Sequence, residues 1–576
     1  MMNINSNIIR PFLTLLRVLP ENTRPLVQTV MIALGAGLSA VFFMIAINYF
    51  YINTYEVFAS RSTLFFLVAS FCLIVGSSLI VGLLLYKYNP DAAGSGIPQL
   101  KAAYWKDLGY VPWRSVLIKF IAGVLSIGGG ASLGREGPTV HIGGGIASNI
   151  AGVLGTPARQ RRSAVVIGAS AGLAAAFNAP LAAITFILEE FVSDINNRFI
   201  GRVVFSSLLG AFVVFAVIGK QPAFQLPSIE AVSWNHYLIV PLVALFASLA
   251  GVIFQMSTLH FRARLKKQKL IPPWLLPCCG GIVTWVVGVS VFLTVQKLGV
   301  FSLGYEDLSR ALDNNFVWWI AGILVVAKLI ATIASYSCGS CGGIFSPLLF
   351  IGGMCGCFIG GLVNLWFPMP PSDLIVLSAV GMSTCLGAVV RAPLTSLLIV
   401  FEMTHQFSLV PGLMIGTFIS IFVSHIAGRL NFYDALLMQD GHELIKVRPP
   451  LDIKSWQNLP ISSIANHHPI VIDTLAKDHL ESLLERYPYQ CFPFILENHE
   501  IGLLTRDQIT ALISKNEIPR IQKAILCNPD QTIKEVGNKF VESLTGVIVV
   551  VNHKTEGIAG IVTLHDVLRA QASIME

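Results

Sequence analysis

Several stretches of this chain contain almost only apolar residues, and they limit the fold more than any other feature. A helix needs about 20 mainly apolar residues to cross the hydrocarbon core of a bilayer. The clearest runs that meet this requirement are 26–50, 63–86, 238–259 and 271–295. Of all 576 residues 54% are hydrophobic and only 12% are charged, against about 25% charged in an ordinary soluble domain. These properties exclude a soluble enzyme, a disordered protein and a secreted disulfide scaffold, and they predict a multi-pass membrane protein.

The charged residues are unevenly distributed, which indicates a second domain. The chain has 39 Lys and Arg and 32 Asp and Glu, of which 11 and 15 lie in the 126 residues from Leu451 onward. We therefore expect an N-terminal segment over 1–25, a membrane domain over 26–445 and a soluble domain over 451–576. The net charge of +11 before Leu451 is typical of positive-inside loops in contact with lipid headgroups, and we expect no nucleic-acid partner.

An internal repeat divides the membrane domain into two halves, which we place at about 60–225 and 238–430. Gly134-Arg-Glu-Gly-Pro138 matches Gly343-Ile-Phe-Ser-Pro347 at an offset of 209, and each is followed by a pair of glycines. Ala179-Pro-Leu181 with Glu189 matches Ala392-Pro-Leu394 with Glu402 at an offset of 213. Hydrophobic segments interrupted by Gly and Pro at corresponding places of two halves are typical of a transporter's binding site. The residues alone leave open whether the halves run parallel or inverted.

Both Gly-x-x-x-Pro elements, and a third at Gly94-Ser-Gly-Ile-Pro98, are typical of a loop that turns into a helix. A helix N-terminus presents free N–H groups and the positive end of its dipole, which favours an anion. Few Lys or Arg accompany these elements, so an anion would be held weakly, as a transport pathway requires. The alternative is that Gly and Pro only permit close helix packing.

Carboxylates within a membrane segment are costly, so each is a candidate for a specific role. Glu136 lies inside the first-half element, where Phe345 occupies the equivalent position in the repeat. There it would occupy an anion site when charged and vacate it when protonated. Glu189 and Glu402 are repeat equivalents, which favours a shared structural role, such as accepting hydrogen bonds. Glu190 has no equivalent acid, which makes it a candidate for a specialised task. We expect Arg135 and a few similar cations to be structural partners or boundary residues: Lys119, Lys328 and Arg391.

The three Gly-x-x-x-Pro elements together resemble the signature elements of the CLC family of chloride channels and transporters, and the tail resembles that family's paired CBS domains. The resemblance covers the membrane domain from about residue 26 to 445. It implies an α-helical membrane domain of two inverted repeats with broken helices. It further implies a homodimer with an anion pathway in each subunit and with both termini in the cytoplasm. The compact loops and the absence of a targeting signal fit a bacterial inner membrane.

The resemblance also implies a role for each site residue. The groups that would coordinate the anion are Ser95, the N–H groups of Ile344 and Phe345, and Tyr433, with helix-start backbone at Gly134, Gly137 and Gly343. Glu136 matches the family's external gate, and Glu190 matches the internal proton-transfer glutamate of many exchangers. Ser95 is typical of members that prefer chloride to nitrate. One departure is Gln99, where many members have Glu.

These roles predict secondary active transport of chloride by exchange for protons, with no enzyme activity. A passive chloride channel of the same fold, gated by voltage or pH, is the alternative, because Glu190 permits proton coupling without requiring it. An intramembrane metalloprotease would need a His-Glu-x-x-His helix, and His442-Glu443 and His499-Glu500 both lack the second His. A cation transporter would line its pathway with several acids. We expect no metal and no required cofactor.

The tail contains a repeat of its own, which predicts two small α/β CBS copies at about 455–515 and 520–576. Gly502-Leu-Leu-Thr505 and Gly560-Ile-Val-Thr563 each follow a strand-like run and precede a helix-like one. The family's ribose-binding pattern, Thr or Ser followed three residues later by Asp, is present at Thr563 and Asp566. The first copy has Gln508 in place of the Asp. The resemblance therefore implies at most one adenine-nucleotide site, with a purely structural tail as the alternative.

Overall fold

The computed structural model describes most of the chain as two compact units. The described residues are 23–156, 158–192, 200–219, 224, 226, 236–428, 430–442, 457, 459–496, 500–543, 545–552 and 557–572. The units divide between Arg448 and Pro449, close to the predicted start of the second domain. Nearly all of the predicted N-terminal segment 1–25 and the junction between the units lie outside the described residues.

The first unit is entirely helical in the residues that the structure describes. The helices of its first half are α2 (Arg24–Tyr51), α3 (Val57–Ala59), α4 (Thr63–Tyr88), α5 (Ile97–Trp105), α6 (Trp113–Gly123), α7 (Glu136–Val153), α8 (Ala158–Phe177), α9 (Pro180–Phe186) and α10 (Ile200–Val217). The helices that follow are α11 (His236–Lys267), α12 (Leu276–Val295), α13 (Tyr305–Leu312), α14 (Trp318–Ser337), α15 (Phe345–Asn364), α16 (Pro371–Val390), α17 (Pro393–Thr404), α18 (Val410–Ser424) and α19 (Phe432–Gln439).

Short helical turns of other types connect several of these helices: Ile52–Glu56, Pro90–Ala92, Val124–Gly128, Ile187–Val192, Pro273–Leu275, Phe407–Leu409, His425–Ala427 and, in the second unit, Ile461–Ser463. Among the described residues, nine helical segments are long and apolar enough to cross a membrane. The four runs singled out from the sequence form α2, α4, α11 and α12, so the prediction of a multi-pass helical protein is confirmed.

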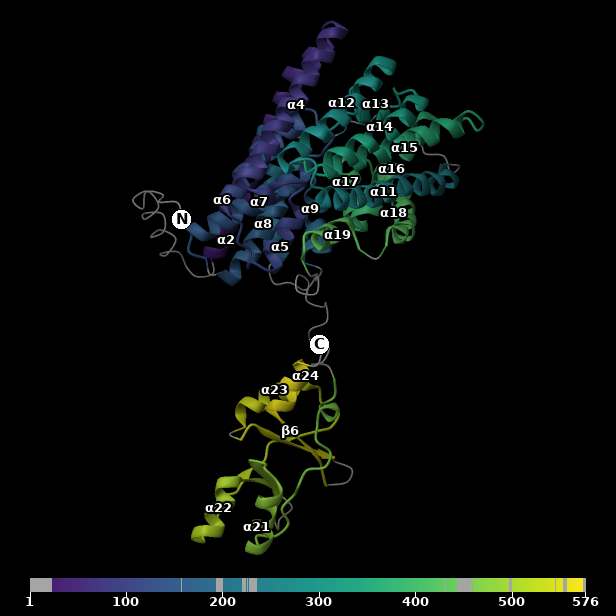
Figure 1. The fold of residues 1–576 in the computed structure, drawn as a ribbon. Coiled ribbons are helices and arrows are strands. Elements are labelled where there is room, and N and C mark those ends of the chain that lie inside the picture. The colour runs from purple at the N-terminus through teal and green to yellow at the C-terminus, as the bar shows by residue number, and fades with distance from the viewer. Residues whose placement is uncertain are drawn as a thin grey trace. The chain divides into compact units, whose positions relative to one another are not determined.

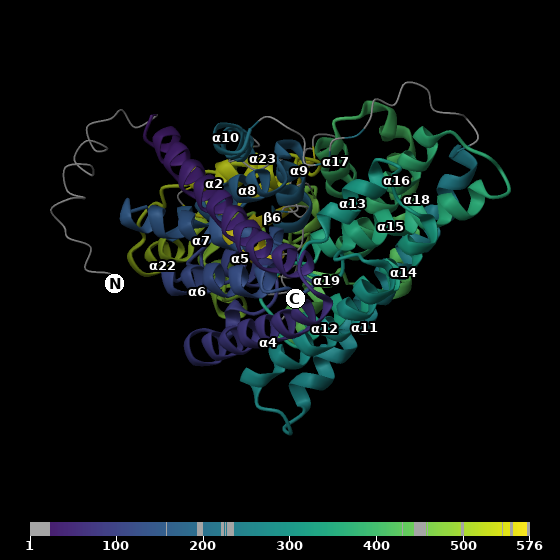
Figure 2. The same ribbon diagram turned by 90° about the horizontal axis from the view of Figure 1, so that it is seen from above.

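The two halves of the repeat lie side by side (Figures 1 and 2). In the first half α7 packs on α8, and in the second half α15 packs on α16. α15 and α16 are buried on almost all sides, and Gly352 and Gly356 of α15 permit close approach to the backbone of α16. α9 and α17 pack against each other across the boundary between the halves.

Two repeat-equivalent carboxylates join the halves at this boundary. Glu402 accepts hydrogen bonds from the N–H groups of Leu181 and Ala182 at the start of α9, at 3.0 and 2.7 Å. Glu189 does the same at the start of α17, where it accepts from Leu394 and Thr395 at 3.1 and 2.9 Å. Each half therefore caps a helix N-terminus of the other. The interpretation of Glu189 and Glu402 as hydrogen-bond acceptors with a structural role is confirmed.

The second unit contains two small α/β layers. The strands are β1 (Cys491–Ile495), β2 (Ile501–Thr505), β3 (Gln522–Lys523), β4 (Leu526–Cys527), β5 (Val547–Asn552) and β6 (Gly557–Thr563). The helices are α21 (Lys477–Arg486), α22 (Arg506–Lys515), α23 (Ile533–Glu542) and α24 (Leu564–Ala572). One sheet has the order β1-β2-β3 with antiparallel pairs. The other has the order β4-β5-β6, with β4 parallel and β6 antiparallel to β5.

The reciprocal capping predicts that Glu402 stabilises the membrane unit. Glu402→Ala removes two charge-assisted hydrogen bonds from a helix start, and the expected cost is about 2–3 kcal/mol. The thermal unfolding midpoint of the detergent-purified protein, followed by tryptophan fluorescence, measures this cost. Glu306→Ala removes an exposed acid that pairs with Arg310 within one helix, and it should leave the midpoint unchanged. Equal midpoints for wild type and Glu402→Ala would contradict the stabilising role.

Candidate anion-binding site

The three Gly-x-x-x-Pro elements, far apart in the chain, meet at one place. Gly134 and Gly343 pair like antiparallel strands, each donating its N–H to the other's carbonyl oxygen at 2.7 and 2.6 Å. Gly94 joins them through parallel pairing with Cys341. A Cβ atom added to Gly137 would lie 2.8 Å from the Cβ of Ser95, so only glycine permits this approach. The close contact between the elements therefore explains their glycines.

Each element ends where a helix begins, so several helix N-termini converge. α5 follows Ser95, α7 begins with Glu136 and α15 begins with Phe345. α7 and α15 have Pro at their third residue, where no intrahelical hydrogen bond is lost. The free N–H groups and dipoles of these helices add to the positive potential of two buried cations in and beside the elements, Arg135 and Lys119. Such a region suits an anion.

The residues predicted to coordinate the anion are all buried. Ser95 is 1% exposed, and its hydroxyl oxygen accepts a hydrogen bond from the Ile97 N–H at 3.2 Å. Ile344 and Phe345 lie at the start of α15 and are fully buried. Tyr433 lies in the first turn of α19, and its buried hydroxyl makes no hydrogen bond within the part of the chain that the structure describes. An orphaned buried donor is costly, so the Tyr433 hydroxyl fits a bound anion.

Glu136 is fully buried, and its carboxylate lies at the N-terminus of α15. Its Oε2 accepts from the Ser346 N–H at 3.4 Å, and its Oε1 accepts from the Ser346 hydroxyl at 2.5 Å. The Tyr305 hydroxyl donates to the same Oε1 at 2.8 Å. The carboxylate therefore uses the backbone N–H group and the helix dipole that an anion would use, while the two hydroxyls bind the carboxylate itself. Sequence reasoning missed both hydroxyls, although Ser346 lies within the second-half element itself.

Glu190 is 2% exposed and belongs to a buried cluster of charged and polar groups. The Lys101 ammonium donates to Glu190 Oε1 at 2.5 Å and to Asp434 Oδ1 at 2.6 Å. The Asn431 amide donates to Glu190 Oε2 at 3.0 Å. Glu190 lies in the π-helical turn Ile187–Val192, a distortion that often marks functional sites. The sequence analysis did not single out Lys101 or Asp434, which lies next to Tyr433.

Two other buried lysines hold loops rather than an anion. The Lys119 ammonium donates to the carbonyl oxygens of Ala92 and Gly94, at 2.9 and 2.6 Å. Lys328, 209 residues later, donates to the carbonyl oxygens of Gly299 and Ser302, at 2.9 and 2.7 Å. Lys119 thus anchors the loop that carries Ser95, and Lys328 anchors the loop before α13. The expected structural role of these two lysines is confirmed.

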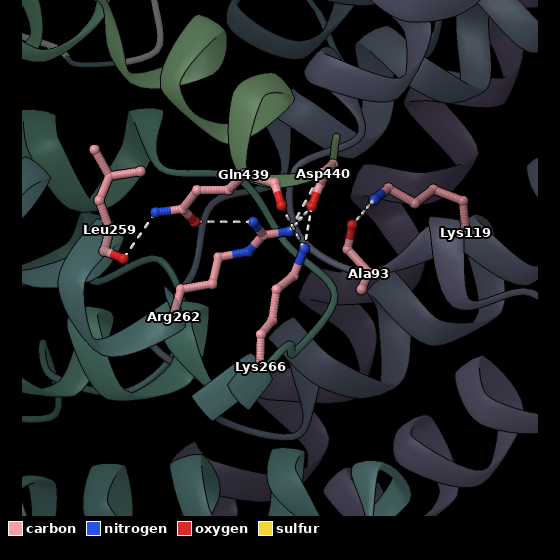
Figure 3. A network of polar contacts seen from close by, with 7 residues as sticks. All are labelled: Ala93, Lys119, Leu259, Arg262, Lys266, Gln439 and Asp440. Carbon is pink, nitrogen blue, oxygen red and sulfur yellow. Dashed lines mark hydrogen bonds and ion pairs between the residues drawn. The ribbon is translucent and has the colours of Figure 1, made fainter. Parts of the chain in front are cut away.

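A cavity of about 710 Å³ in the first unit reaches the loop that carries Ser95. Its wall includes Gly94, Pro98 and Tyr336, and a Cβ atom on Gly94 would lie 3.2 Å from the Tyr336 hydroxyl oxygen. At another side of the cavity, Arg262 and Lys266 both contact the carboxylate of Asp440 (Figure 3). The wall of the cavity therefore contains both these charged residues and part of the loop that carries Ser95.

The predicted nucleotide residues of the second unit contact each other. The Thr563 N–H and hydroxyl donate to Asp566 Oδ2 at 2.9 and 2.7 Å, and the Asp566 N–H donates back to the hydroxyl at 3.3 Å. Thr505 and Gln508 form the same capping box at the start of α22. Capping of α24 accounts for the Thr563–Asp566 pattern without a ligand.

Much of this chain matches family models and known proteins. The family model described as voltage gated chloride channel matches residues 77–425, and the CBS domain model matches 517–573. An H(+)/Cl(−) exchange transporter from Vibrio cholerae is 30% identical over 388 residues, which are 65% of this chain and 78% of that protein. A slow cyanobacterial Cl−/H+ antiporter has the same fold, with a TM-score of 0.64 and 24% identity over 72% of this chain and 97% of that one. A eukaryotic CLC transporter matches with a TM-score of 0.60 and 20% identity over 94% of this chain and 98% of that one.

The cluster around Glu190 predicts a strong dependence on Lys101. Lys101→Met leaves two buried carboxylates without their shared cation, and it should destabilise the protein by about 3–5 kcal/mol. Lys101→Met combined with Asp434→Asn should recover part of this loss, because one buried charge is removed as well. Thermal unfolding in detergent measures both variants.

The matched control for this prediction is Lys266→Met, which removes a lysine that is 45% exposed and pairs with Asp440. An exposed ion pair contributes little, so this variant should unfold close to the wild type. If Lys101→Met combined with Asp434→Asn is less stable than Lys101→Met alone, excess buried negative charge is not the cause of the destabilisation.

Proposed function

Because this chain belongs to the CLC family of chloride channels and transporters, we propose that it moves chloride across the membrane in exchange for protons. The observation that carries the proposal is the position of Glu136, whose buried carboxylate lies at the start of α15. A carboxylate and a chloride ion compete there for the same backbone N–H groups and helix dipole. Since a carboxylate leaves such a site more readily when protonated, proton uptake and chloride entry become linked.

The proposed cycle uses two acids. Glu136 occupies the site when charged, and it gives way to chloride when it takes up a proton. Glu190 then carries the proton between Glu136 and the other side of the membrane. The Vibrio cholerae relative is named as an exchanger of H+ and Cl−, which supports coupling in this chain too.

The chemistry around the site supports a weakly held anion. The available donors are backbone N–H groups and hydroxyls such as that of Tyr433, while Lys119 and Lys328 donate to backbone carbonyls. Partial charges bind an anion less tightly than a free ammonium group would, and a transported ion must also be released. Chloride is the substrate that we propose.

A passive chloride channel is the second candidate, and the contact between Lys101 and Glu190 favours it. A proton relay must take up and release protons, and the Lys101 ammonium competes with a proton for Glu190 Oε1 at 2.5 Å.

A homodimer, cytoplasmic termini and a bacterial inner membrane remain predictions. So does an adenine nucleotide at Thr563 and Asp566.

Transport by purified protein in liposomes distinguishes the candidates. With a chloride gradient and the voltage set by valinomycin and potassium, an exchanger drives protons uphill and changes the external pH. Glu136→Ala should abolish proton movement while chloride flux persists, because the competing carboxylate is gone. Glu190→Gln should also abolish proton movement, because the relay is gone.

Glu306→Gln is the matched control, since it removes an exposed acid on α13 and should transport like the wild type. Chloride flux without proton movement in the wild type would make the protein a channel. Uphill proton movement that survives Glu136→Ala would overturn the proposed cycle.

A further inference from the structure

We propose that the hydroxyls of Tyr305 and Ser346 form a clamp that holds the Glu136 carboxylate in the anion site and thereby sets the affinity for chloride. In this proposal Tyr305 is a positioning residue, because it acts on the anion only through Glu136. The inference rests on the proposed function, in which Glu136 and chloride compete for one site. It adds a residue that lies outside all three Gly-x-x-x-Pro elements.

The clamp consists of three oxygen atoms in mutual contact. Tyr305 donates to Glu136 Oε1 at 2.8 Å and Ser346 donates to the same atom at 2.5 Å, while the two hydroxyl oxygens are 2.9 Å apart. Each hydroxyl has one hydrogen, and a carboxylate oxygen has two lone pairs, so both hydroxyls can donate to Oε1 together. Hydrogen bonds to a charged acceptor are about twice as strong as neutral ones. These two hydrogen bonds hold the carboxylate in this position.

The Tyr305 ring is held from several sides. The Arg135 guanidinium lies over the ring, with its carbon 5.5 Å from the centroid, and the Phe224 ring packs edge-on at 5.3 Å. Lys328 and Asp307 fix the preceding loop, since the Asp307 carboxylate accepts from the Gly299 N–H at 2.8 Å. These contacts fix the ring so that its hydroxyl points at Glu136. The Tyr305 side chain therefore loses little conformational freedom when it donates to the Glu136 carboxylate.

The internal repeat supports a role for this loop in the site. α5 and α13 both begin after a glycine with positive φ, Gly96 at 88° and Gly304 at 77°, which are 208 residues apart. Lys119 and Lys328 anchor the two preceding loops in the same way. α13 is thus the second-half counterpart of α5, whose loop brings the Ser95 hydroxyl to the anion site. Tyr305, the first residue of α13, brings its hydroxyl to the carboxylate that occupies the site.

By holding Glu136 in the site, the clamp lowers the apparent affinity of the protein for chloride. Chloride binds only in the fraction of molecules whose site is not occupied by Glu136, and the apparent Kd rises as that fraction falls. Loss of one hydrogen bond to a charged group would change this equilibrium by about tenfold or more, and the apparent Kd changes by less where the Glu136-occupied form does not dominate. Removing the Tyr305 hydroxyl should therefore make chloride bind more tightly.

Isothermal titration of chloride into the purified full-length protein tests the proposal. We expect Tyr305→Phe, which keeps the ring and its packing, to bind chloride about three- to tenfold more tightly than the wild type. Ser346→Ala should shift the affinity in the same direction, and it provides an independent variant of the same clamp. Glu136→Ala should bind most tightly, because the competitor is absent.

The decisive variant combines Tyr305→Phe with Glu136→Ala. Without the carboxylate the clamp has nothing to hold, so the double variant should bind chloride as Glu136→Ala does. The control is Tyr55→Phe, which removes another buried hydroxyl that donates to the Gly129 carbonyl oxygen at 3.2 Å, and it should match the wild type.

Two results would overturn the clamp, and they are distinguishable. If Glu136→Ala tightens binding but Tyr305→Phe and Ser346→Ala do not, the clamp is wrong and the proposed function stands. If Glu136→Ala itself leaves chloride affinity unchanged, Glu136 does not compete with the anion, and the proposed function fails together with the clamp.

Discussion

The backbone pairing of Gly134 with Gly343 is the contact on which the site depends. Two short hydrogen bonds join the halves of the repeat at the point where α7 and α15 begin. Because neither residue has a side chain, the helix starts approach closely enough for their N–H groups to face one small volume. Glu189 and Glu402 join the halves a second time, at the starts of α17 and α9. The site is thus built between the halves, and neither half contains it alone.

The buried charges have a consistent arrangement. Lys119 and Lys328 donate to backbone carbonyls, and Lys101 lies between two carboxylates. A buried charge is costly unless it is paired and hydrogen-bonded, so each cation is compensated by neighbouring oxygen atoms. The anion site therefore depends on partial charges of N–H and O–H groups. Glu136 is the full negative charge placed among them, which makes its position sensitive to each neighbouring hydroxyl.

Much of the fold could be predicted because its signals are local in the chain. Apolar runs indicate membrane helices, and the repeated Gly-Pro elements indicate both the two halves and the helix starts of the site. The unmatched acid Glu190 was also recognisable, since the repeat provides an internal comparison. Lys101 and Asp434 were missed because they are 333 residues apart, and each alone resembles an ordinary charged residue of a short helix.

The class of protein, the two halves and the residue types at the helix starts follow from the sequence, because hydrophobic length and glycine or proline position act within a few residues. Which side chains meet depends on the packing of the whole fold. Tyr305 reaches Glu136 across 169 residues, and its role depends on an anchored loop and a packed ring rather than on any motif. Hydrogen bonds need atoms within about 3 Å, and such distances between remote segments follow from packing alone.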